Sequence, residues 1–256
     1  MAQPWMSVVI PAYNEQDVIA GTVEEVRGWL ERRDRPWEIL VVDNASEDRT
    51  DEVLAPLLED SRVRLLRNEV NRGKGYSVRR GMLEATGELR LMCDADCGPS
   101  LASLERMVDL AGEVDVVAGS RLAAGARVAR AQPFARRLAG KGFLTLCRLI
   151  MREPTRDIFC GFKLFRGEAA GAAFSRQSLE GWTFDVEVLA IARGLGYRVT
   201  ECGIAWDNRE DSRLSMRRVL IPVVRELLRA RRHVSRVLGS PPVATAAKDP
   251  VVDSRG

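Results

Sequence analysis

Short apolar runs alternate along the chain with longer stretches whose apolar residues recur at helical spacing. Residues 7–10 form the first run, typical of a buried strand, and residues 15–31 then place apolar side chains three and four positions apart. The same patterns predict further strands at residues 38–42, 62–66, 88–93, 114–118, 161–165 and 197–204. They predict further helices at residues 48–58, 76–85, 101–111, 134–151, 183–195 and 214–238. This alternation is typical of an α/β domain with a mostly parallel, Rossmann-like sheet and helices on both faces.

The chain divides into one large domain and a short appendage. Its 256 residues suit a single domain of residues 1–215, followed by a basic helix at residues 216–238. Residues 239–256 are rich in Pro and Ala, which predicts a disordered tail. Residues 123–133, rich in Ala, Gly and Arg, predict a mobile loop. In a parallel sheet ligands bind at the carboxyl ends of strands, so polar residues there are the first candidates for function.

Composition narrows the classes of partner. Hydrophobic residues make up 46% of the chain, enough for a sizeable core. A net charge of +3 is too small to indicate a nucleic-acid partner. Of the 39 basic residues only four are lysines, and arginine suits bidentate binding of phosphate.

Cysteine usage and the N-terminus point to the cytoplasm. The five cysteines are odd in number and form no Cys-x-x-Cys motif, which argues against a disulfide framework or a zinc site. The first 15 residues have no basic segment followed by an apolar run, so we expect no signal peptide. No stretch approaches the roughly 20 apolar residues that cross a bilayer. We therefore expect a cytoplasmic protein.

The predicted strand at residues 88–93 ends in an acidic motif. Asp94 and Asp96 stand two apart in C-D-A-D-C-G-P, and carboxylate oxygens are ligands that Mg²⁺ or Mn²⁺ prefers. A diphosphate would complete the metal's coordination shell. The alternative is a plain turn, since Asp, Gly and Pro are common turn residues.

Three other strand ends carry polar residues. Residues 11–15, P-A-Y-N-E, place Glu15 and backbone amides after the first strand, or form a simple capped turn. Asp43 ends the second strand, where a carboxylate can bind a base N–H or a ribose hydroxyl, or cap a helix. Residues 71–75, N-R-G-K-G, offer flexible backbone and Lys74 before a helix N-terminus, which suits an anion or an ordinary loop.

These motifs together resemble the family 2 glycosyltransferases of GT-A fold. The matching segments are S-V-V-I-P-A-Y-N-E, V-V-D-N-A-S-E-D-R-T, N-R-G-K-G, C-D-A-D and G-S-R, followed by C-G-F-K-L-F, G-W-T-F-D-V-E-V-L and R-E-D-S-R-L. More narrowly, the chain is similar to the polyprenyl-phosphate mannosyl- and glucosyltransferases. The resemblance covers roughly residues 6–216, and as an ordered set the motifs are highly specific.

The resemblance implies a role for each matching position. Residues of the nucleotide pocket would be Pro11, Ala12, Tyr13, Glu15, Val42, Asp43, Asp94 and Ala95. Asp96, joined by Asp94, would bind the metal, Mg²⁺ or Mn²⁺. Phosphates would be held by Arg121, Arg209 and Lys163, and Lys74 would join the residues that bind the nucleotide sugar. Asp185 and Glu187 would lie near the acceptor.

Two positions depart from the family pattern. Asn44 stands where the family often has a second acid, so D-N-A-S replaces D-D-G-S. Gly98 stands where the family often has Gln two residues after the metal-binding aspartate. We therefore expect the metal to have one protein ligand fewer.

The implied reaction is an inverting displacement at the anomeric carbon of a UDP- or GDP-linked hexose. A polyprenyl phosphate acceptor is already ionised at neutral pH and needs no strong base, whereas a hydroxyl acceptor does. The single histidine, His233, lies in the basic C-terminal helix and suits a surface position. The arginines of residues 121–137 suit either an acceptor phosphate or a solvated loop.

The helix at residues 216–238 has two interpretations. Seven arginines, interleaved with apolar residues that include Val219, Leu220, Val223, Leu227, Leu228 and Val234, fit a helix lying on the inner, anionic face of a membrane, where a lipid acceptor is met. They also fit a helix packed on the domain with a basic outer face, and this is the interpretation we favour.

Rival functions fit less well. A glycosidase has no use for the nucleotide-type loop, and a nucleotidyltransferase needs a glycine-rich loop where residues 11–15 contain no glycine. A nucleotide-sugar-binding module leaves the carboxylate pair unexplained. Within glycosyltransferases, transfer to a small soluble acceptor such as a natural product stays open.

Overall fold

The computed structural model describes residues 3–96, 98–128, 134–206 and 216–239. A seven-stranded sheet in the order β3-β2-β1-β4-β7-β5-β8 forms its centre. The strands are β1 (Met6–Ala12), β2 (Trp37–Asp43), β3 (Val63–Arg67), β4 (Leu89–Cys93), β5 (Val116–Ser120), β7 (Phe162–Arg166) and β8 (Val199–Gly203). All pair in parallel except β7, which is antiparallel to both β4 and β5. The short strands β6 (Arg127–Val128) and β9 (Ala205–Trp206) pair separately.

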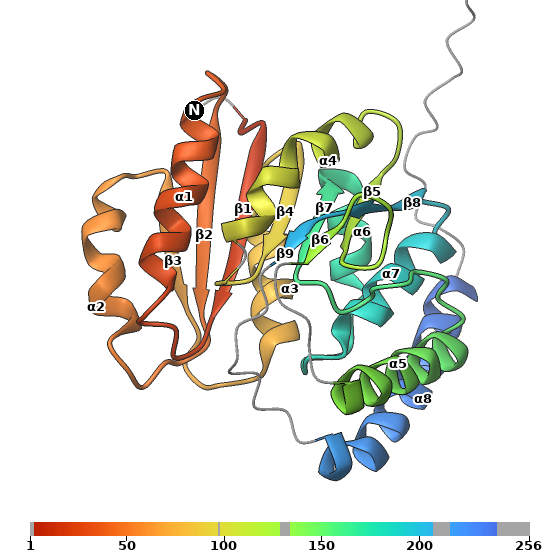
Figure 1. Ribbon diagram of the computed structural model, residues 1–256. Helices are drawn as coiled ribbons and strands as arrows, with labels where there is room; N and C mark the ends of the chain where they lie inside the picture. The colour runs from red at the N-terminus through yellow and green to blue at the C-terminus, as the bar shows by residue number, and fades with distance from the viewer. Residues whose placement is uncertain (1–2, 97, 129–133, 207–215, 240–256) are drawn as a thin grey trace, which may run out of the picture.

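Helices cover both faces of the sheet, as Figure 1 shows. On one face lie α1 (Ile19–Glu31), α2 (Thr50–Leu54), the 3-10 helices η1 (Ala55–Glu59) and η2 (Gly98–Ser103), and α4 (Leu104–Leu110). On the other lie α3 (Lys74–Glu84), α5 (Phe134–Met151), α6 (Gly167–Ser175), α7 (Phe184–Gly194) and α8 (Met216–Gly239). Alternate residues of each strand feed the two cores. In β1, Val8 and Ile10 join the first core and Val9 joins the second.

This arrangement confirms the predicted α/β class, with a mostly parallel sheet and helices on both faces. Two predicted helices differ most in extent from those observed. The helix predicted at residues 15–31 begins only at Ile19. The loop before it is held to the segment after β2, because Glu15 N donates to Thr50 Oγ1 and Gln16 N donates to Asp48 Oδ2. The helix predicted at residues 48–58 is split, and its second part is a 3-10 helix with Pro56 near its start.

Two elements were absent from the sequence prediction. The helix α6, G-E-A-A-G-A-A-F-S, is so rich in small apolar residues that it shows little helical periodicity. The strand β6 lies within residues 123–133, which were predicted to be a loop. The predicted tail lies outside the described residues, except for Gly239, which ends α8.

The C-terminal helix α8 packs against α5 and α7 with one apolar face. Val223, Leu227, Ala230 and Val234 are buried there. Figure 1 shows α5 and α8 together, at the end of the molecule toward which β1 and β2 point. No helix within the described residues combines the length and apolarity needed to span a membrane.

Candidate functional site

The ends of β1, β2 and β4 bring the first group of polar residues to one edge of the sheet. Because β1 pairs in parallel with both neighbours, Ala12 lies opposite Asp43, and Asp94 follows β4 at the same edge. Pro11 lies opposite Val42 in the same ladder. The predicted nucleotide residues of the two strands are therefore neighbours.

Asp43 is fully buried, with one oxygen satisfied and one not. Its Oδ1 accepts hydrogen bonds from the backbone N–H and the hydroxyl of Ser46. Its Oδ2 lies 3.3 Å from Arg67 Nε but accepts no hydrogen bond within the described residues. A buried carboxylate oxygen without a hydrogen bond is costly, so this atom is suited to receive an N–H or O–H from a ligand.

The loop after β1 is bonded to the loop after β2. The backbone N–H of Asn14 donates to Ser46 Oγ at 2.9 Å, and Glu15 N donates to Thr50 Oγ1 at 3.0 Å. Asn14 itself has a left-handed φ of 56° and accepts from Glu47 N at 2.8 Å. These bonds hold the loop after β1 against the loop that follows Asp43, while the Tyr13 side chain stays 42% exposed.

Asp94 forms an ion pair with the first residue of α3. Lys74 Nζ lies 2.6 Å from Asp94 Oδ1 and 2.7 Å from Oδ2. The carboxylate occupies the space in front of Gly161, where an added Cβ would lie 1.8 Å from Asp94 Oδ2. The backbone N–H of Asp94 also donates to Gly161 O at 2.9 Å. Any side chain at position 161 would therefore collide with the Asp94 carboxylate in its observed position.

Asp96 follows at the edge of the same group. Ala95 is buried and its carbonyl accepts a hydrogen bond from the Thr22 hydroxyl, which anchors the backbone between the two aspartates. The Asp96 side chain is half-buried. Within the described residues no three His, Cys, Asp or Glu side chains gather closely enough to hold a metal ion. Asp94 and Asp96 supply oxygen donors of the type that Mg²⁺ and Mn²⁺ prefer, so their chemistry fits a metal whose remaining ligands come from a diphosphate and water.

Arg121 follows β5 and pairs with Asp157. Its Nε and Nη2 donate to the two carboxylate oxygens at 2.8 and 2.7 Å, and its backbone N–H donates to Oδ2 at 2.8 Å. Burial disfavours the charged form of Asp157, but these bonds outweigh it and hold the pKa of that carboxyl below its usual range. The guanidinium lies 5.4 Å from the centre of the Trp206 ring. Arg121 is thus a fixed cation, 29% exposed.

Lys163 and Asp185 form a closed, buried pair. Lys163 Nζ lies 2.5 Å from Asp185 Oδ1 and also donates to Cys160 O at 2.6 Å. Both side chains are less than 5% exposed. Burial raises the pKa of Asp185, although Lys163 and Lys74 oppose that shift. The pair fixes β7 to α7 beside the Lys74–Asp94 pair, which favours a positioning role over direct contact with a ligand.

The remaining predicted residues, Glu187, His233 and Arg209, are not brought into this group by the described structure. Glu187 accepts hydrogen bonds from Ser178 N at 2.9 Å and Leu179 N at 2.7 Å, so it organises the segment before α7. His233 is bonded to Arg176 O at 2.8 Å, in keeping with a structural position. Arg209 lies outside the described residues.

Sequence reasoning missed Asp157 as the partner of Arg121. The only available signal was a single acid in the apolar segment D-I-F-C, and the pairing joins residues 36 positions apart.

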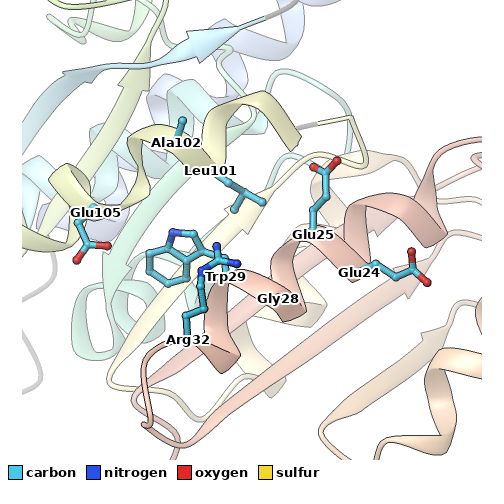
Figure 2. A pocket seen from close by; sticks show the side chains of 8 residues that line it. All are labelled: Glu24, Glu25, Gly28, Trp29, Arg32, Leu101, Ala102 and Glu105. Atoms are coloured by element: carbon cyan, nitrogen blue, oxygen red, sulfur yellow. The ribbon is translucent and has the colours of Figure 1, made fainter.

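A cavity of about 700 Å³ lies elsewhere, between α1 and the η2–α4 segment (Figure 2). It is lined by Glu24, Glu25, Gly28, Trp29, Arg32, Leu101, Ala102 and Glu105. Trp29 stacks on Trp5, which precedes β1, with ring centres 6.3 Å apart. The cavity therefore lies toward the amino ends of the strands, away from the candidate site, and includes none of the predicted site residues.

Comparisons with known proteins agree with the fold and with the motifs. The family model described as glycosyl transferase family 2 matches residues 7–180. The chain is 31% identical to a dolichyl-phosphate beta-glucosyltransferase of Dictyostelium discoideum over 89% of this chain and 74% of that protein. It is 33% identical to a human dolichyl-phosphate beta-glucosyltransferase over 82% of this chain and 69% of that protein.

A solved structure shares the architecture. It is glucosyl-3-phosphoglycerate synthase of Mycobacterium tuberculosis, crystallised with Mn²⁺ and UDP-glucose, which superposes with a TM-score of 0.62. The sequences are 18% identical, and the match covers 88% of this chain and 79% of that one. At 18% identity, the similarity between the two structures shows a shared fold and nothing further.

Proposed function

The chain belongs to glycosyl transferase family 2, has the GT-A fold and is a glycosyltransferase, and from this premise we propose that it transfers a hexose from a nucleoside-diphosphate sugar to a polyprenyl phosphate. The observation that carries the donor half is the edge formed by Asp43, Asp94 and Lys74. It offers a buried acceptor for the nucleoside, carboxylates for a metal and a cation for phosphate. Dolichyl phosphate in the names of relatives more than 30% identical supports the acceptor.

The donor lies across the ends of β1, β2 and β4 in this proposal. Asp43 Oδ2 accepts from the base or the ribose, and Pro11, Ala12 and Val42 form the apolar floor. Tyr13 and Glu15 border the mouth, while Asp94, Ala95 and Asp96 face the diphosphate. A Mg²⁺ or Mn²⁺ ion held by Asp96 and Asp94 would neutralise the charge that develops on the leaving nucleoside diphosphate. Lys74 contributes positive charge at the same point.

The acceptor approaches from the side of Arg121. An ionised phosphate oxygen attacks the anomeric carbon on the face opposite the leaving group, so the configuration inverts. Because that oxygen already carries the negative charge, no general base is required. Arg121, held rigid by Asp157, orients the acceptor phosphate, and the Lys163–Asp185 pair keeps β7 and α7 in register beside it. Arg209 is proposed as a further phosphate ligand on the resemblance alone.

The outer face of α8 supports an electrostatic contact with a membrane surface rather than insertion into it. Its apolar side is already buried against the domain, so it is not available for insertion between lipids. Its outer side carries Arg225, Arg229 and Arg232, all exposed, with Leu228 44% exposed among them. The neighbouring α5 exposes Leu149 by 70%. We propose electrostatic contact with an anionic lipid surface, which brings the lipid acceptor to the enzyme.

The test is a donor and acceptor screen. The full chain is incubated with Mn²⁺ or Mg²⁺, a panel of UDP- and GDP-sugars and a short polyprenyl phosphate, with Asp96→Ala as the inactive control. Metal-dependent transfer from one donor to the lipid, absent in the variant, is the expected result. Donor hydrolysis without transfer would move the acceptor to a small soluble molecule. No nucleotide release with any donor would overturn the proposal.

A further inference from the structure

Asn44 is a buried hub between the nucleotide edge and the start of α3. It directly follows Asp43 and is 4% exposed. Its Oδ1 accepts from Asn68 Nδ2 at 3.0 Å and from the backbone N–H of Arg72 at 3.2 Å. Its Nδ2 donates to Asn71 Oδ1 at 2.7 Å. One side chain thus ties β2 to three residues of the loop before Lys74.

Backbone donors fix which amide atom stands where. Arg72 N can only donate, so the atom of Asn44 that faces it must be the carbonyl oxygen. Gly73 N donates to Asn71 Oδ1 at 3.0 Å, so that oxygen cannot exchange places with Nδ2. Position 44 must therefore present an acceptor on one side and a donor on the other. An amide satisfies both demands, and an ionised carboxylate satisfies only the first.

The same bonds set the start of α3. Gly73 precedes the helix with a φ of 101°, and an added Cβ there would lie 2.5 Å from Glu180 O. Asn68, held by Asn44, also donates to Ser77 Oγ at 3.0 Å, one turn into α3. Asn44 thus contacts both the loop that leads into Lys74 and, through Asn68, the first turn after it.

From this geometry we infer that Asn44 is a positioning residue for the donor diphosphate: its amide, acting through Asn71 and Asn68, holds Lys74 at Asp94. The inference rests on the proposed function, because it assigns Lys74 to the diphosphate. A carboxylate at position 44 would face Asn71 Oδ1 at 2.7 Å and add a second buried negative charge next to Asp43.

A double-mutant cycle tests whether Asn44 acts through Lys74. The variants are Asn44→Ala, Lys74→Ala and the two together, and the measurement is calorimetric binding of UDP and GDP with Mg²⁺. We expect Asn44→Ala to weaken binding about tenfold in the wild-type background, the size of one or two hydrogen bonds. In the Lys74→Ala background it should change binding less than about twofold. The same tenfold effect in both backgrounds would overturn the inference.

A matched pair of isosteric variants isolates the donor requirement. Asn44→Asp removes the donor to Asn71, whereas Asn71→Asp adds the same charge but keeps an oxygen toward both Asn44 Nδ2 and Gly73 N. We expect the loss of binding to be at least about fivefold larger for Asn44→Asp. Equal losses would show that charge alone matters and would overturn the inference.

Thermal unfolding of each variant separates positioning from folding. A fall in melting temperature with unchanged nucleotide binding would reduce Asn44 to a structural residue. If the wild-type protein binds neither nucleotide, the proposed function itself fails, and the inference falls with it. If the wild-type protein binds but the cycle shows independent effects, the inference alone fails.

Discussion

The two halves of the sheet edge are built in different ways. At β1, β2 and β4, candidate residues stand at the ends of parallel strands, and most are held by hydrogen bonds within and between the loops that follow, as Asp43 is by Ser46. At β5 and β7, the cations are fixed by partners far along the chain, Arg121 by Asp157 and Lys163 by Asp185. The donor half is thus organised mainly by hydrogen bonds among the loops that follow the strands, together with the Lys74–Asp94 pair, and the acceptor half by ion pairs.

This difference matches what each half is proposed to do. A nucleotide presents many hydrogen-bonding groups, and fixed backbone turns can match them one by one. A phosphate on a lipid chain presents mainly charge, for which a rigid guanidinium is sufficient. Damage to the donor half should therefore stop every reaction, and damage to the acceptor half should stop transfer alone.

The largest effect is expected at Asp96. Asp96→Ala removes a proposed metal ligand, so both donor hydrolysis and transfer should fall by about 1,000-fold. The measurement is release of nucleoside diphosphate with and without acceptor, at saturating Mg²⁺. Melting temperature should stay close to the wild-type value. Retention of donor hydrolysis would break the comparison, because it would move this residue out of the donor half.

Arg121→Gln should separate the two reactions. Transfer to a polyprenyl phosphate should fall by about 100-fold, because the acceptor phosphate loses its proposed cation, while donor hydrolysis changes less than about threefold. Arg121→Lys is the control, since it keeps the charge but loses the bidentate geometry. Its rate of transfer should lie between those of the wild-type protein and Arg121→Gln. An equal loss of both reactions would place Arg121 with the donor instead.

The two halves also differ in how far the sequence predicted them. Asp43 and Asp94 could be placed because an apolar strand followed by an acid is a local pattern, and parallel strands bring such ends together. The antiparallel direction of β7 could not be read from a five-residue apolar run, since a run has no direction. The partner of Arg121 was missed for a related reason. An ion pair between residues 36 positions apart produces no pattern in the sequence around either residue. Asn44 was recognised as a departure, but its three bonds depend on residues brought close by folding.

The outer arginines of α8 should affect delivery rather than chemistry. Replacing Arg225, Arg229 and Arg232 together by Gln should weaken binding to vesicles containing anionic lipid by at least about tenfold, since each arginine contributes about 1 kcal/mol near such a surface. Donor hydrolysis without lipid should be unchanged, as should the melting temperature. Cosedimentation with anionic and with neutral vesicles gives the measurement. Equal binding of both proteins to anionic vesicles would remove α8 from the acceptor half.

The smallest expected effect is on the pH dependence of stability, and it concerns Asp157. The pKa of Asp157 is lowered in the folded protein, despite burial, by its bonds to Arg121. Its contribution to the free energy of unfolding is therefore complete above the ordinary aspartate pKa of about 4 and is lost as the pH falls through the lower, folded value. Asp157→Asn should be less stable than wild type at pH 7, and the gap should narrow toward pH 3. Chemical denaturation at both pH values measures it, and a constant gap would contradict the assigned ion pair.

The position of β7 has a consequence for how the chain can be assembled. In the folded sheet β7 lies between β4 and β5 and begins only at Phe162, so a chain that has emerged from a ribosome as far as β5 still lacks the strand that pairs with β4 on this side. Until that strand arrives, β4 is an unpaired edge of four parallel strands, the kind of surface that recruits other chains. Truncations that stop before residue 162 should therefore aggregate, whereas those that stop after residue 166 already contain the strand that closes this edge.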